Sequence, residues 1–140
     1  MKRILVGLDA SARARPVLKA AVELAESTGA KLVLLRAVGV PVELPIEAYR
    51  LSPASLAEVL QQEAERGLLD LSKEVPPTRL ESCRVGVGAP WQVVCDAAKE
   101  LDVDLIVIGS HGRSGVQKLV LGSVAGKVVT LSARPVLVVR

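Results

Sequence analysis

Four residues near the C-terminus have the types and the spacing to hold a phosphate. Two residues separate Gly109 from Gly112, and nine residues separate Gly112 from Gly122, which is followed directly by Ser123. Glycine permits positive φ and lets backbone N–H groups approach an anion closely, and a serine hydroxyl can donate a hydrogen bond. A helix that begins at Ser123 would add unpaired N–H groups and a partial positive charge. The pattern therefore predicts a phosphate-binding turn.

Two other nucleotide motifs are missing from the sequence. There is no GxxxxGK[ST], and the first apolar run leads into GLDAS (residues 7–11) without a GxGxxG. P-loop hydrolysis and nicotinamide chemistry therefore lose their main support. The alternative without a ligand is that Gly109 and Gly112 are turn residues, and that Gly122 and Ser123 only begin a helix.

The strands and helices that must position this turn are expected to alternate along the chain. We expect strands at Lys2–Leu8, Lys31–Val38, Arg79–Gly86, Asp104–Ile108 and Pro135–Val139, and helices at Ser11–Thr28, Ala54–Val75, Ala89–Leu101 and Ser123–Ser132. Such alternation predicts one α/β domain over residues 1–140, an open five-stranded parallel sheet with helices on both faces. With the strand order 3-2-1-4-5, ligands would bind beyond the carboxyl ends of strands one and four, where the order reverses.

Side-chain patterns predict which residues face the core. The stripe of the first helix ends at Thr28, and Gly29 stops that helix. The second helix has an imperfect inner edge, made of Leu56, Val59, Leu60, Glu63, Gly67, Leu68 and Leu71. Cys83 and Cys95 have no CxxC spacing, so we expect two reduced, buried thiols. The third strand alternates and is expected near a sheet edge, and Gly39–Pro53 reads as a loop.

Composition excludes several classes of protein. The net charge of +3 is scattered, and Trp91 and Tyr49 are the only aromatic residues, so we expect no nucleic-acid partner. No apolar run reaches the length of a membrane span or of a signal-peptide core, so we expect a cytoplasmic protein with no membrane partner.

The stretch GSHGRSGVQKLVLGSVAGKVVTLSARPVLVV (residues 109–139) resembles the C-terminal half of universal stress proteins, and Gly109, Gly112, Gly122 and Ser123 fill the motif of that family's ATP-binding subgroup. KRILVGLD and KLVLLRAV are similar to the family's first two strands, so the resemblance covers the whole chain. It implies an adenine-nucleotide alpha hydrolase-like, Rossmann-like fold. It also implies ATP, ADP or AMP as ligand, with Mg²⁺ or Mn²⁺ carried by the phosphates rather than by protein ligands.

The resemblance also implies which residues contact the nucleotide. Asp9 would face the ribose or the adenine, Ala37 would meet the adenine edge with its backbone, and the start of the last helix would hold the phosphates. The full set is Gly7, Leu8, Asp9, Ala37, Ile108, Gly109, His111, Gly112, Arg113, Gly122, Ser123, Val124 and Ala125. We therefore expect Gly122→Val to abolish binding and leave the fold intact.

Some residues keep a second interpretation. Asp9 could instead cap the first helix, and Arg113 could be a solvated cation. Lys118 and Lys127 are expected at the surface, and Trp91 in the core or an interface. Arg36 stands where the family often has His, and Gly126 stands where Glu is common.

Three functions remain open. The first is a nucleotide-binding regulator of the stress response with slow or no hydrolysis and no catalytic residues. The second is an ATP-cleaving or adenylyl-transferring enzyme of the related hydrolase group, and the third is a scaffold that has lost its ligand. The apolar last strand, Pro135–Val139, is expected at a sheet edge and predicts pairing with a second copy in a homodimer.

Overall fold

The computed structural model describes residues 1–39, 53–111 and 121–140. In these residues the elements follow the order β1 (Arg3–Gly7), α1 (Ala14–Thr28), β2 (Lys31–Val38), α2 (Pro53–Ser72), β3 (Leu80–Val87), α3 (Pro90–Glu100), β4 (Leu105–Gly109), α4 (Ser123–Leu131) and β5 (Val136–Val139). The strands form a parallel sheet of order β3-β2-β1-β4-β5. The α/β class and the strand order predicted from the sequence are confirmed.

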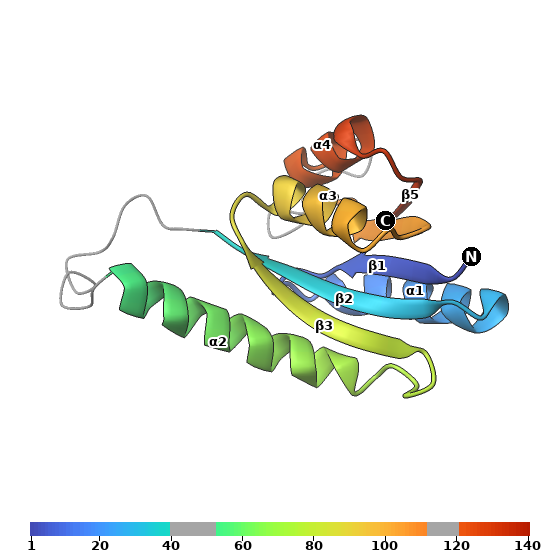
Figure 1. Cartoon of the computed structure of the whole chain (residues 1–140), viewed down its shortest axis with the longest axis horizontal. Helices are drawn as coiled ribbons and strands as arrows, with labels where there is room; N and C mark the ends of the chain where they lie inside the picture. Colours follow the sequence, from blue (N-terminus) through green and yellow to red (C-terminus); the bar gives the residue numbers. More distant parts are fainter. Residues whose placement is uncertain (40–52, 112–120) are drawn as a thin grey trace.

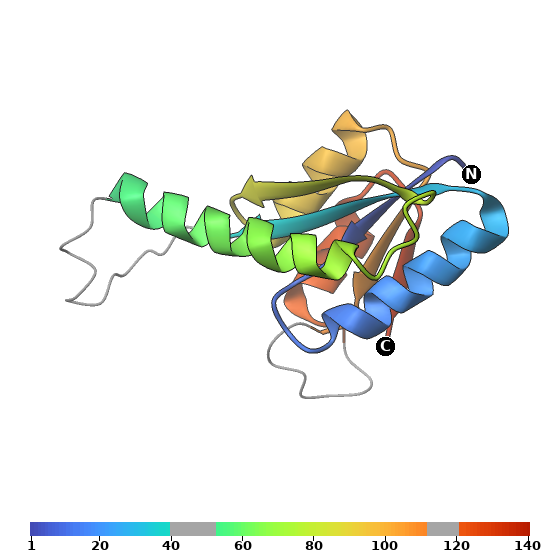
Figure 2. The same ribbon diagram turned by 90° about the horizontal axis from the view of Figure 1, so that it is seen from below.

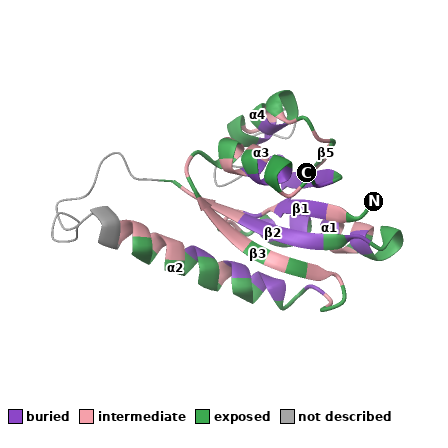
Figure 3. Cartoon of the chain, in the orientation of Figure 1, coloured by how far each residue is buried: buried purple, intermediate pink, exposed green. Residues whose placement is uncertain are grey.

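Helices cover both faces of the sheet (Figure 1). α1 and α2 lie on one face and α3 and α4 on the other, as the turned view in Figure 2 also shows. Alternate residues of β1 serve the two faces: Ile4 and Val6 pack towards α1, whereas Leu5 packs towards α3 and α4. Because both faces are covered, the central strands are buried along most of their length (Figure 3) and read as continuous apolar runs.

Glycine and proline set helix ends where the sequence predicted. Gly29 follows α1 with φ 79°, and its N–H donates to the carbonyl of Ala25 at 2.8 Å, a left-handed helix stop. Pro90 is the first residue of α3. The expected first helix begins three residues late, at Ala14, because residues 9–11 form a turn of their own.

Several core expectations were wrong. Val59 and Glu63 of α2 are exposed, whereas Leu68 and Leu71 are buried as predicted, and Ala64 and Ser72 complete the buried side of that helix. Thr28 is exposed and its hydroxyl donates to the carbonyl of Leu24. Cys83 and Cys95 are both free, as expected, but Cys83 is exposed and Cys95 only partly buried. Cys83 lies on β3, which is an edge strand, and an edge strand leaves more of its surface open.

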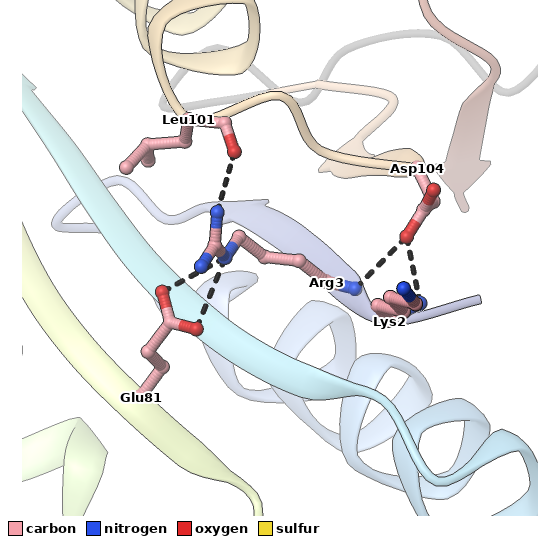
Figure 4. Close-up of polar contacts among 5 residues, drawn as sticks. All are labelled: Lys2, Arg3, Glu81, Leu101 and Asp104. Carbon is pink, nitrogen blue, oxygen red and sulfur yellow. Dashed lines mark hydrogen bonds and ion pairs between the residues drawn. The ribbon is translucent and has the colours of Figure 1, made fainter.

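Polar contacts tie the amino edge of the sheet together (Figure 4). The Arg3 guanidinium donates to the Leu101 carbonyl at 2.6 Å and pairs with Glu81 of β3 at 2.9 Å. The Asp104 carboxylate accepts from the backbone N–H groups of Lys2 and Arg3 at 2.6 and 3.0 Å. These two backbone hydrogen bonds lower the pKa of Asp104. The contacts join β1, β3 and the ends of α3 and β4 at the edge away from the predicted phosphate turn.

Candidate functional site

The strand order reverses between β1 and β4. These strands are neighbours, with Ile4 paired to Leu105 and Val6 to Val107. β1 continues into α1 on one face, and β4 leads to α4 on the other (Figure 1). In open parallel sheets, the carboxyl ends of strands at such a reversal are where ligands bind. The two turns that the sequence singled out therefore start side by side.

Glycines end both strands, and both are closely packed. A Cβ on Gly7 would lie 3.0 Å from Cγ2 of Ile108, and a Cβ on Gly109 would lie 3.2 Å from Cγ2 of Val17. Their lack of a side chain thus lets the two strand ends pack tightly, whether or not a ligand is bound.

Backbone hydrogen bonds join Ser110, directly after β4, to the end of β5 and to the start of α4. Ser110 N–H donates to the carbonyl of Val139 at 2.8 Å, and Gly122 N–H donates to the carbonyl of Ser110 at 2.7 Å. A Cβ on Gly122 would lie 2.9 Å from that Ser110 oxygen and 3.4 Å from Cα of His111. The fold of Gly122→Val stays a prediction, and this packing argues against an intact fold, because the valine would press against backbone.

At the start of α4, main-chain donors have no capping side chain among the described residues. Gly122 is the N-cap residue with extended geometry, and no side chain of the described residues caps this end. The bond from Gly126 N–H to the Gly122 carbonyl, at 2.9 Å, is the first of the helix. The amides of Ser123, Val124 and Ala125 precede it and belong to the first turn, whose N–H groups have no intrahelical partner. Together with the helix dipole, this end suits an anion.

On the β1 side, Asp9 makes a local turn rather than a helix cap. Its Oδ1 accepts from the N–H of Ser11 at 2.9 Å and from the hydroxyl of Ser11 at 2.6 Å. The N-cap of α1 is Arg13, so the capping interpretation of Asp9 does not hold. Among the described residues, no hydrogen bond reaches the second carboxylate oxygen, Oδ2, which is therefore available as an acceptor.

The other predicted residues differ in what they can offer a ligand. The side chains of Leu8, Ile108 and Ala125 are buried, so these residues can present chiefly backbone atoms, whereas Ser123 and Val124 are exposed. Ala37 lies near the carboxyl end of β2, where it is paired with Gly86 of β3. His111 Nδ1 lies 3.2 Å from the Ser110 hydroxyl. Gly112, Arg113 and Lys118 lie outside the described residues.

No metal ligand cluster is found: in residues 1–39, 53–111 and 121–140, no group of three His, Cys, Asp or Glu side chains is placed to hold an ion. Within the same ranges, none of the helices has the length and apolarity needed to cross a bilayer.

A profile of the Universal stress protein family matches residues 1–140. The chain belongs to the universal stress protein family. The universal stress protein YxiE of Bacillus subtilis is 33% identical over 149 residues, covering 99% of this chain and 98% of YxiE.

Solved structures agree with the fold. The structure of MJ0577, a protein of Methanocaldococcus jannaschii, matches with a TM-score of 0.83 and 29% identity, covering 99% of this chain and 94% of that one. A universal stress protein crystallised in complex with cAMP matches with a TM-score of 0.66 and 28% identity, covering 99% of this chain and 97% of that one.

Three residues of this universal stress protein belong to the same edge but were not predicted as site residues. Ser110 is 6% exposed and joins β5 to the start of α4 through its backbone. Ser11 fixes the Asp9 carboxylate, and Arg36 donates to the carbonyls of Leu8 and Asp9. The Asp-x-Ser spacing of a side-chain turn could have indicated Ser11. No local pattern pointed to Arg36, because its partners are 27 and 28 residues away.

Lys127 and Trp91 join the two helices on the α4 face. The Lys127 ammonium lies 5.6 Å from the centroid of the Trp91 ring, within the range of a cation–π contact. Lys127 is exposed, as expected, and Trp91 packs partly buried against the core of that face. The indole therefore contacts the helix that begins at Ser123, one turn beyond its first residue.

Proposed function

We propose that this universal stress protein binds an adenine nucleotide, and specifically ATP, at the carboxyl ends of the neighbouring strands β1 and β4. The observation that carries the proposal is the start of α4, where the amides of Ser123, Val124 and Ala125 are not capped by a described side chain and Gly122 is held against the end of β4. A related universal stress protein was crystallised with cAMP, which is also an adenine nucleotide.

In this proposal the residues have separate roles. The amides at the start of α4 and the Ser123 hydroxyl bind the phosphates, together with Gly109, His111, Gly112 and Arg113. The Asp9 carboxylate accepts a hydrogen bond from the ribose or the base, and backbone atoms of Gly7, Leu8, Ala37 and Ile108 line the base. Mg²⁺ or Mn²⁺ would be carried by the phosphates.

Calorimetry with ATP and Mg²⁺ tests the proposal. Ser123→Ala removes one hydroxyl hydrogen bond to a charged ligand, so the Kd for ATP should rise about tenfold. Thr130→Ala is a matched control, because Thr130 lies in the same helix and its hydroxyl bonds to the Gly126 carbonyl at 2.8 Å. It should leave the Kd unchanged. No heat of binding at millimolar ATP would remove the proposal and favour a scaffold without ligand.

We further propose that hydrolysis is slow or absent, so that the nucleotide acts as a regulatory ligand. Phosphoryl transfer needs a positioned metal and a group that orients the attacking water. His111, the single histidine of the chain, instead has its Nδ1 beside the Ser110 hydroxyl. Release of ADP or AMP over several hours is the measurement, and multiple turnovers per minute would establish an ATP-cleaving enzyme instead. Mass spectrometry of the purified protein identifies which adenine nucleotide it carries.

We also propose that two copies of the chain form a homodimer by pairing through β5. β5 is at the edge of the sheet, with one neighbour among the described strands, and its Leu137 is 40% exposed. An open apolar edge favours pairing with another strand. Light scattering at micromolar concentration should give twice the mass of the chain, and Leu137→Lys should return the monomer. A monomeric wild type would contradict this part alone.

A further inference from the structure

Arg36 reaches from β2 to the loop that follows β1. It lies near the carboxyl end of β2, on the face covered by α1 and α2. Its Nε donates to the carbonyl of Leu8 at 3.3 Å, and its Nη2 donates to the carbonyl of Asp9 at 2.9 Å. One planar guanidinium thus holds two consecutive carbonyls, which a fork of fixed N–H groups does better than a single ammonium.

This contact begins where the regular sheet ends. The bond from Leu8 N–H to the Leu35 carbonyl, at 2.9 Å, is the last backbone hydrogen bond between this loop and β2 in the part of the chain that the structure describes. Beyond it, the hydrogen bonds of the Asp9 side chain within the described ranges go to Ser11, which belongs to the same loop. In the described chain, the Arg36 guanidinium is therefore what connects the backbone of Asp9 to the sheet.

Helix α2 leaves room for this guanidinium at Gly67. A Cβ on Gly67 would lie 2.5 Å from Nη1 of Arg36 and 3.5 Å from its Cζ. Gly67 is inside a 20-residue helix, where glycine costs about 1 kcal/mol relative to alanine. The helix thus contains an unfavourable residue at the place where a larger one would push Arg36 off the loop.

We propose that Arg36 is a positioning residue for the nucleotide site: it fixes the Leu8–Asp9 backbone and so holds the Asp9 carboxylate in its binding orientation, with Gly67 providing the space. This rests on the proposed function, in which Asp9 contacts the ribose or the base. A loop fixed before binding lowers the ordering cost of association, so Arg36 contributes to affinity without touching the ligand.

Gly67→Ala separates this role from general stability. The new methyl meets the tip of a flexible side chain, so the fold tolerates it and the helix gains propensity, and Tm should stay the same or rise. The displaced guanidinium should release the loop and raise the Kd for ATP about tenfold, as if one loop in ten were competent to bind. A purely structural role would instead move Tm and Kd in step.

A double-mutant cycle tests whether the two substitutions act through the same contact. Arg36→Ala should raise the Kd by a similar factor, and Gly67→Ala should add nothing in the Arg36→Ala background, because no guanidinium remains to be displaced. Arg79→Ala is the control: Arg79 also donates to a loop carbonyl, that of Gly29 at 2.8 Å, but at the opposite edge of the sheet. It should lower Tm and leave the Kd unchanged.

Hydrogen exchange of the ligand-free protein distinguishes failure of the Arg36 proposal from failure of the proposed nucleotide binding. Both Arg36→Ala and Gly67→Ala should speed exchange of the amides at residues 9–11, and Arg79→Ala should not. Unchanged exchange and unchanged Kd in both variants, or strictly additive losses of affinity, would overturn the proposal. A wild type that binds no ATP would refute the proposed function and, with it, the role in affinity. The exchange data would then still decide whether Arg36 fixes the loop.

Discussion

Gly122 directly precedes α4 and Gly126 lies inside it. The first is closely surrounded by backbone and the second is not. A Cβ on Gly122 would lie 2.9 Å from the backbone oxygen of Ser110, whereas a Cβ on Gly126 would have no neighbour within 4 Å among the described residues. The first glycine is thus required by close packing of backbone on backbone. The second leaves open space on a helix surface.

We therefore expect opposite effects from the same substitution. Gly122→Ala should lower the free energy of unfolding by about 1–3 kcal/mol through overpacking and should weaken ATP binding by moving the start of α4. Gly126→Ala should raise the free energy of unfolding by about 0.5–1 kcal/mol, through helix propensity, and leave the Kd for ATP unchanged. Urea unfolding and calorimetry of both variants provide the test. Equal stability of the two variants would contradict the packing argument.

The Asp104 carboxylate makes stability depend on pH. Its pKa is lowered in the folded state by the backbone N–H groups of Lys2 and Arg3. The stabilisation is therefore present above the unfolded pKa and is lost as pH falls through the lower folded pKa. Asp104→Asn should reduce stability at neutral pH and flatten the loss of stability on acidification. Urea midpoints measured from neutral pH down to about pH 2 show the difference. Curves that stay parallel over this range would contradict this role of Asp104.

Single residues were the hardest to predict from the sequence. The spacing of Gly109, Gly122 and Ser123 correctly indicated a strand end followed by a helix start, because these residues have strong local preferences. Val59 was predicted inside and is 43% exposed, because an apolar residue at helical spacing does not fix the rotation of the helix about its axis. The partners of Arg36 come from the fold, and no sequence pattern contains them.

At the scale of elements, α3 and α4 are joined by one side-chain pair at the surface. The Lys127 ammonium lies over the Trp91 ring, at 5.6 Å from its centroid. Lys127→Gln should cost about 0.5–1 kcal/mol of stability and shift the emission of the single tryptophan. Lys99→Gln, an exposed lysine in the last turn of α3, is the control and should leave the emission unchanged. Identical emission spectra for Lys127→Gln and the wild type would show that the pair does not form in solution.

The elements themselves were largely predictable. Each expected strand and helix is present, because the apolar runs are short, those of the central strands are buried on both faces, and the helical stripes are long enough to show a period. The errors lie at ends: the first helix starts at Ala14 rather than Ser11, because the Asp9 side chain folds the preceding residues into a turn. The expected loop at Gly39–Pro53 lies mostly outside the described residues, as does the middle of the predicted phosphate turn.

At the scale of the whole molecule, two core clusters share the same strands. One lies under α1 and α2 and the other under α3 and α4, and β1, β2 and β4 contribute to both. Neither cluster can be lost alone without exposing the strands that support the other. We therefore expect the described domain to unfold as one cooperative unit.

Leu18→Ala tests this cooperativity. Leu18 is 2% exposed in the cluster under α1, and Trp91 packs against the cluster on the opposite face. The substitution should cost about 2–5 kcal/mol. Tryptophan fluorescence and far-UV circular dichroism should report the same lowered midpoint. Separate transitions for the two signals would show that the two faces melt independently.

The position of β1 in the middle of the sheet has a consequence for biosynthesis. Ile4 pairs with Leu32 on one side and with Leu105, 101 residues further along the chain, on the other. At ordinary translation rates, β4 leaves the ribosome about 5–20 s after β1. During this interval the nascent chain carries an unpaired strand edge, whose central residues Ile4, Leu5 and Val6 are aliphatic. The growing polypeptide is thus most open to chaperones and to misassembly before β4 arrives to pair with β1.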